Sequence, residues 1–315
     1  ATMADMLLHD QPPLKPEYEA KIIEILSCSV TQSSTGEPPV GRQSVKKGAP
    51  SAKEARDLKE DRARLTEILI PLVPRLLTRF STDSEKIVNL VNIPLHFQLD
   101  MYLSPRMQTH LTELMDALDA LIEKHIDEDV LRAVAELYYH LTNYSPLTAI
   151  VDTHKSKLLD GIAAFIRKSM QQFEDDQMGE EEEALFVSYI KRMAAFAGFM
   201  DLRQWDLWDI LVKIVSNYSR EDSSRDVRER ATQMMFVQLV FDLSTLKREG
   251  EIPKADHVRK LKKRRDQLVR ILSQTLIEEA VGVEQAYLCI CDLMILFGSQ
   301  LAEDSKAFEP LIWRP

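Results

Sequence analysis

The sequence predicts an all-α protein built as an array of helix hairpins. Apolar residues recur at helical spacing over nearly the whole chain, from residue 16 to residue 302. Glycine is scarce, with only 9 in 315 residues, whereas the tight turns of sheets and phosphate-binding loops both depend on it. The length also exceeds the size at which one compact core usually keeps growing. A compact bundle would show the same periodicity, but so many helices favour an elongated array.

The expected helices follow the periodicity and its interruptions. Ser51 is placed to cap a helix, and Glu54 three residues later completes a capping-box pattern. Pro71 and Pro74 must break or kink that helix because each lacks a backbone donor. The expected helices span residues 17–32, 51–80, 84–91, 94–103, 105–125, 127–144, 152–174, 181–199, 205–216, 224–250, 254–279 and 283–302. Paired, they give units of about 40–50 residues, which predicts a HEAT-like solenoid, an α-α superhelix of helix hairpins.

Three segments differ in composition. Residues 1–50 combine the first helix with a polar loop rich in serine, glycine and proline, residues 51–104 hold the helices interrupted by prolines, and residues 105–315 hold the regular hairpins. The loop carries Arg42, Lys46 and Lys47. It is either a DNA-facing arm or merely a solvated connection.

Composition excludes several classes of protein. The formal net charge of −10 rules out a uniformly basic nucleic-acid coat, so any DNA contact must come from a local patch. The three cysteines give no disulfide framework, and an odd count suits a reducing compartment. No run reaches the ~18 apolar residues of a membrane span. Because no catalytic or phosphate-binding motif is present, we expect neither an enzyme nor a cofactor or metal.

The strongest charge feature is a basic run on one expected helix. Val258, Leu261, Leu268 and Leu272 form the apolar stripe of that helix. Most cations of the run fan over the remaining surface, and the run comprises Arg259, Lys260, Lys262, Lys263 and Arg264. It either contacts DNA phosphates or an acidic partner, without base specificity, or is a solvated face. Arg265 falls on the stripe itself and therefore needs an ion-pair partner or a groove.

A carboxylate also interrupts the last expected helix. Residues 283–302 are apolar nearly all round, so we expect cover on two sides. Its main core stripe is expected at Ile290, Met294, Phe297 and Leu301. Asp292 points almost oppositely, amid Leu288, Ile295 and Leu296. This pattern suits a groove that accepts a partner's lysine or arginine, or an internal ion pair with Arg265.

Two tryptophans mark another short helix. Trp205 and Trp208 are three residues apart and should share one face. Core anchoring is the ordinary interpretation of such a pair, and an aromatic ligand slot is the alternative.

Several strings, in this order and spread over nearly the whole chain, resemble the stromalin family of cohesin subunits (SA/STAG type). They are PPVGR at 38–42, SAKE at 51–54, DSEKIVNL at 83–90, WDL at 205–207, CDLMI at 291–295 and EPLI at 309–312. The segment 145–151 and the acidic stretch near Asp176 match the vertebrate pattern poorly.

The resemblance implies a non-enzymatic internal fragment of a longer HEAT-repeat scaffold, nuclear and chromosome-associated. It implies binding of the cohesin kleisin subunit, with the site around Asp292 and Arg265, help in holding cohesin on DNA, and docking of cohesin regulators. The alternative is a generic HEAT adaptor, for example in transport or phosphatase regulation, that shares the architecture without these partners.

Overall fold

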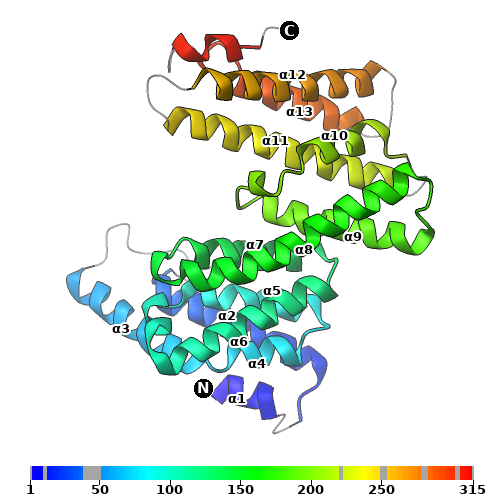
Figure 1. The fold of residues 1–315 in the computed structure, drawn as a ribbon. Coiled ribbons are helices and arrows are strands. Elements are labelled where there is room, and N and C mark those ends of the chain that lie inside the picture. The colour runs from blue at the N-terminus through cyan, green and yellow to red at the C-terminus, as the bar shows by residue number, and fades with distance from the viewer. Residues whose placement is uncertain are drawn as a thin grey trace. The chain divides into compact units, whose positions relative to one another are not determined.

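The computed structural model describes residues 2–9, 13–37, 51–219, 223–248, 254–277, 283–301 and 306–313. Its regular structure over these ranges is entirely helical (Figure 1). The chain divides into two compact units, Ala1–Leu158 and Leu159–Pro315, and the division falls within one long helix, α8. Each unit carries its own core, so each is described by itself.

The first unit is built from antiparallel helix pairs. Helix α2 packs against α3 and α5, α5 packs against α7, and α4 packs against α6. Leucine, isoleucine and valine side chains at helical spacing fill the layers between them. The elements are α1 (Thr2–His9), α2 (Pro16–Thr35), α3 (Ala52–Leu69), α4 (Val73–Arg79), α5 (Ser84–Asn92), η1 (Ile93–His96), η2 (Leu99–Leu103), α6 (Pro105–Lys124), α7 (Glu128–Thr142), η3 (Ser145–Leu147) and the start of α8 (Thr148–Glu174).

Local sequence signals explain the ends of α3. The Ser51 hydroxyl accepts from the Glu54 backbone N–H at 3.3 Å, and the Glu54 carboxylate accepts from the Ser51 N–H at 2.8 Å, which confirms the predicted capping box. The predicted break at the prolines is also confirmed, because α3 ends at Leu69 and α4 begins at Val73. Residues 94–103 differ from expectation: they form two 3₁₀ helices rather than one α-helix.

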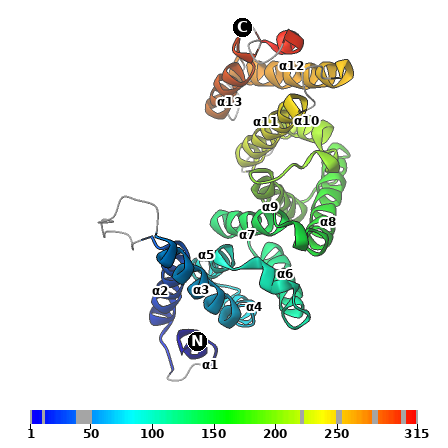
Figure 2. The same cartoon turned by 90° about the vertical axis from the view of Figure 1, so that its left-hand side faces the viewer.

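The second unit continues the pairing with longer helices. Helix α11 packs against α9 and α10 on one side and against α12 and α13 on the other. The short C-terminal η5 lies against α12, as Figure 2 shows in red. The elements are the remainder of α8, α9 (Glu180–Ala197), η4 (Arg203–Trp205), α10 (Trp208–Asn217), α11 (Ser224–Arg248), α12 (Ala255–Ile277), α13 (Val283–Leu296) and η5 (Lys306–Leu311).

The two tryptophans anchor this second core. Trp205 and Trp208 are 5% and 3% exposed, which confirms core anchoring. The indole N–H of Trp205 donates to Asp160 at 2.8 Å, and that of Trp208 donates to Gln267 at 3.0 Å. Each buried indole N–H is therefore satisfied, as burial requires. No described helix is long and apolar enough to span a membrane.

Candidate partner-binding and DNA-contact surfaces

Helix α13 leaves a large part of its apolar surface uncovered. Its buried stripe is Ala286, Cys289 and Leu293, continued by Phe297 just beyond the helix. These positions follow the 3.6-residue period and face α12 and α11. The predicted stripe was wrong in its phase at Ile290 and Met294, because Met294 is exposed and Ile290 is only partly buried. Since α13 is apolar nearly all round, its sequence carries little information about which face turns inward.

The exposed side of α13 is apolar and includes one carboxylate. Ile295 is 79% exposed and Leu288 is 50% exposed, while Leu296 is partly buried. Asp292 is exposed between them, and no described side chain forms an ion pair with it. Tyr287 and Met294 extend the same exposed set, which sequence reasoning missed. We call Tyr287, Leu288, Asp292, Met294, Ile295 and Leu296 the α13 face.

The carboxylate of Asp292 also acts on its own helix. Burial, together with the charge of Asp292, raises the pKa of the Cys289 thiol to about 12. Cys289 therefore stays protonated and apolar in character at neutral pH. The α13 face thus presents its charge outward while the inward side of the helix stays neutral.

Arg265 does not belong to this face. It is 3% exposed, and its guanidinium donates to the Leu311 carbonyl and to Asp266 while lying 5.6 Å from the centre of the Phe297 ring. The expectation that Arg265 would line a partner groove is corrected by this burial, and the alternative of an internal pair with Asp292 is corrected as well. A cation on the apolar stripe is tolerated because a carboxylate, a carbonyl and an aromatic ring surround it. Arg265 fastens η5 to α12.

The basic run of α12 separates into two groups. Lys260, Lys262 and Lys263 are exposed, and Arg259 is exposed while paired with Asp256 one turn earlier. Arg264 is different: its side chain is 11% exposed. The four exposed cations lie on the part of α12 that faces away from its apolar stripe, as expected for a phosphate-contacting or solvated surface.

Arg264 is held by the neighbouring helices, which corrects its assignment as a DNA contact. Its guanidinium donates to Asp242 of α11 at 3.0 Å and lies 4.8 Å from the centre of the Trp208 ring. Asp242 also accepts from Arg203, which pairs with Asp201 at 2.6 Å. Burial opposes ionisation of Asp201, but the hydrogen bonds and charge of Arg203 outweigh it and lower the pKa of that carboxyl. The network is structural.

The remaining predicted DNA contacts lie in the loop after α2. Arg42, Lys46 and Lys47 fall within residues 38–50, outside the described residues. Their assignment stays a prediction.

Comparison with known proteins is consistent over the whole chain. A family model described as "Cohesin subunit SCC3/SA, HEAT-repeats domain" matches residues 1–241, which confirms the predicted HEAT-type helical architecture. Cohesin subunit scc-3 of Caenorhabditis elegans is 76% identical over 315 residues, covering 100% of this chain and 29% of that protein. Cohesin subunit SA-1 of Xenopus laevis is 29% identical over 93% of this chain and 23% of its own length.

Cohesin subunit SA-3 of Homo sapiens is also 29% identical, over 99% of this chain and 26% of its own length. The chain therefore spans less than a third of each of these relatives. With the family model matching well over half of its residues, and with an all-helical fold, the chain belongs to the SCC3/SA family of cohesin subunits.

Proposed function

We propose that this chain is a non-enzymatic scaffold segment of cohesin that binds the kleisin subunit through the α13 face. In this proposal it also helps to hold cohesin on DNA, in the nucleus and on chromosomes. The observation that carries the proposal is the uncovered α13 face, where exposed apolar side chains surround Asp292, a carboxylate that no described side chain pairs. Exposed apolar surface with a polar element marks a protein-interaction site.

The chemistry of the α13 face defines what the kleisin segment must offer. Leu288, Met294 and Ile295 would bury apolar side chains of the partner, and their desolvation would supply most of the affinity. Asp292 would receive a lysine or arginine, which fixes the orientation of the bound segment. A partner helix with apolar residues at i, i+3 and i+4 and one flanking cation satisfies both demands.

The test is calorimetric binding to the central region of the same species' kleisin. The unmodified chain should bind, and Asp292→Lys should weaken binding by about 100-fold or more, because it places a cation against the partner's cation and leaves both buried. Glu284→Lys is the matched control, since Glu284 is exposed on the same helix and undergoes the same charge change. Binding retained by Asp292→Lys would move the site elsewhere. No binding by the unmodified chain would favour a generic HEAT adaptor.

For DNA we propose contact through Arg259, Lys260, Lys262 and Lys263, with Arg42, Lys46 and Lys47 as further candidates. Three exposed lysines within four residues can neutralise phosphates without reading bases. Affinity should be weak and should fall steeply with salt. Replacing Lys260, Lys262 and Lys263 by Glu should lower the slope of log affinity against log salt by about 3, roughly 1 for each lost contact.

The matched control for this DNA measurement is Lys168→Glu on α8, which reverses an exposed lysine outside the basic run. Fluorescence anisotropy with a duplex of arbitrary sequence, repeated at several salt concentrations, gives the slope directly. A slope that the triple substitution leaves unchanged would exclude these lysines as phosphate contacts.

A further inference from the structure

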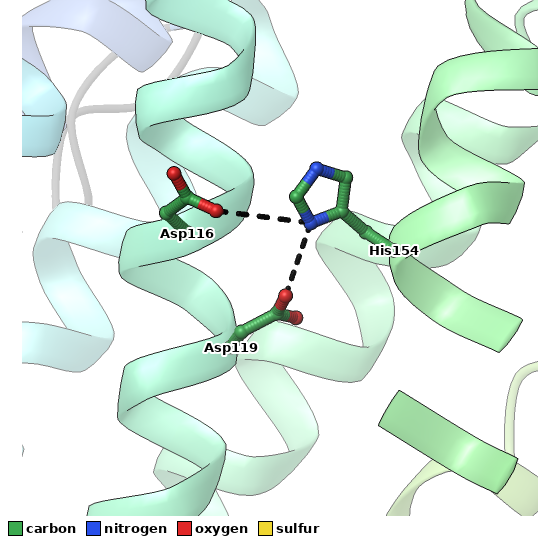
Figure 3. A group of neighbouring side chains, drawn as sticks. All are labelled: Asp116, Asp119 and His154. Atoms are coloured by element: carbon green, nitrogen blue, oxygen red, sulfur yellow. Dashed lines mark hydrogen bonds and ion pairs between the residues drawn. The ribbon is translucent and has the colours of Figure 1, made fainter. Parts of the chain in front are cut away.

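Three side chains of metal-binding type meet in the first unit. Asp116 and Asp119 lie one turn apart on α6, and His154 reaches toward both from α8 (Figure 3). The His154 Nδ1 is 3.0 Å from Asp119 Oδ2 and 4.0 Å from Asp116 Oδ1. All three atoms lie within 4.8 Å of one another. Ligands held at about 2.1 Å around a tetrahedral zinc are roughly 3–4 Å apart, so small side-chain rotations would close the site.

Tyr138 of α7 orients one of these carboxylates. Its hydroxyl donates to Asp119 Oδ1, which leaves Oδ2 directed at His154. Burial, with the charge of Asp119 adding to it, raises the pKa of Tyr138 well above its usual value, so the phenol remains a donor. Carboxylates that bind metals are commonly held by such a second hydrogen bond, which fixes their orientation.

The charge of the group is not balanced by any described lysine or arginine. Elsewhere, partly buried carboxylates have two cations each: Asp242 pairs with Arg203 and Arg264, and Glu19 pairs with Lys86 and Arg79. Asp119 is comparably enclosed, with 23% of its side chain exposed, but its ion-pairing partner among the described side chains is a histidine, which is charged only when protonated. At neutral pH two carboxylates on one helix face therefore share this single titratable counter-charge.

We infer that Asp116, Asp119 and His154 form a zinc site in which water completes the coordination. One imidazole nitrogen and two carboxylates suit Zn²⁺, whereas Ca²⁺ and Mg²⁺ prefer oxygen ligands throughout. Asp116, 69% exposed, provides an open side for the ion to enter. Because the ligands come from α6 and α8, the bound ion ties these two helices together. Binding requires neutral His154, so affinity falls as the imidazole protonates.

The test is zinc titration of the chelator-treated chain by calorimetry. One zinc per chain should bind, and His154→Gln or Asp119→Asn should each weaken that binding by about tenfold or more. His110→Gln is the matched control: His110 contacts Glu113 at 2.7 Å on the same helix as the two aspartates, but this pair belongs to no three-ligand group among the described residues. The control should keep the affinity of the unmodified chain. Asp292→Lys should also leave zinc binding unchanged, which separates this inference from kleisin binding.

Two further readouts protect the result from misfolding and from cysteine binding. Zinc should raise the thermal midpoint of the unmodified chain and of His110→Gln but not that of His154→Gln, while all three should share the same circular dichroism without zinc. Cobalt substituted for zinc should show no thiolate charge-transfer absorption. No zinc binding, equal binding by His154→Gln, equal loss in His110→Gln, or a cobalt–thiolate spectrum would each overturn the assignment.

Discussion

Helices α7 and α13 are similar in length and are both dominated by apolar residues, but they are covered very differently. In α7 eight residues are buried: Val130, Leu131, Ala133, Val134, Ala135, Leu137, Tyr138 and Leu141. In α13 only Ala286, Cys289 and Leu293 are buried within the described residues. The first helix is enclosed by α5 and α6, whereas the second contacts α11 and α12 and leaves its other side open. Apolar content beyond what a helix buries identifies a surface that binds something else.

The largest expected effect comes from the same substitution placed in each helix. Leu137 is 0% exposed and Leu288 is 50% exposed. Leu137→Ala should lower the free energy of unfolding by about 2–5 kcal/mol, because it leaves a cavity. Leu288→Ala should change it by less than about 1 kcal/mol but weaken kleisin binding by about tenfold. Urea unfolding followed by circular dichroism, with calorimetric binding alongside, measures both quantities.

The comparison fails if the two substitutions destabilise the chain equally, since α13 would then be packed as tightly as α7. Hydrogen exchange provides a check that needs no substitution: the amides of α7 should be protected more strongly than those of α13.

A smaller effect should distinguish α7 by its response to pH. Burial, followed by the charge of Arg62, lowers the pKa of His140 on α7, and the same causes lower the pKa of the nearby His96. The buried Nε2 of His140 has no hydrogen-bond partner among the described residues, so protonation would add an N–H without an acceptor. Unfolding restores the pKa of both histidines to about 6.5. Their contribution is therefore complete above about pH 6.5 and is lost as the pH falls toward the folded values.

The measurement for this pH effect is the free energy of unfolding at pH 7.5 and pH 5. The loss on acidification should be about 1 kcal/mol smaller when His96 and His140 are both replaced by glutamine. His110→Gln again serves as the control, because His110 lies toward the solvent side of α6. An unchanged pH dependence in the double variant would show that carboxylates, not these histidines, cause the acid sensitivity.

Sequence reasoning succeeded where the signal is local. The capping box at Ser51, the break at Pro71 and Pro74 and the burial of the two tryptophans depend on neighbouring residues and backbone chemistry, which a sequence displays directly. The family resemblance was equally readable, because its strings are spread over the chain.

It failed where the outcome depends on distant partners. Arg264 has the composition of a surface cation and is buried only because Asp242 of α11 and Trp208 of α10 come to meet it. The phase of α13 was ambiguous because an all-round apolar helix has no polar side to orient it. The zinc ligands were also missed: Asp116 and Asp119 are read as exposed helix residues until α8 brings His154 beside them.

Arg264 and Arg265 are consecutive, and on a helix consecutive side chains point about 100° apart. One reaches Asp242 and Trp208, and the other reaches Phe297 and Leu311. Together they act like two keys cut at different angles on one shaft: α12 cannot turn about its own axis without breaking contacts on one side or the other. The direction in which Lys260, Lys262 and Lys263 project is thereby fixed in advance of any ligand, so a flat array of phosphates would meet a prearranged set of charges.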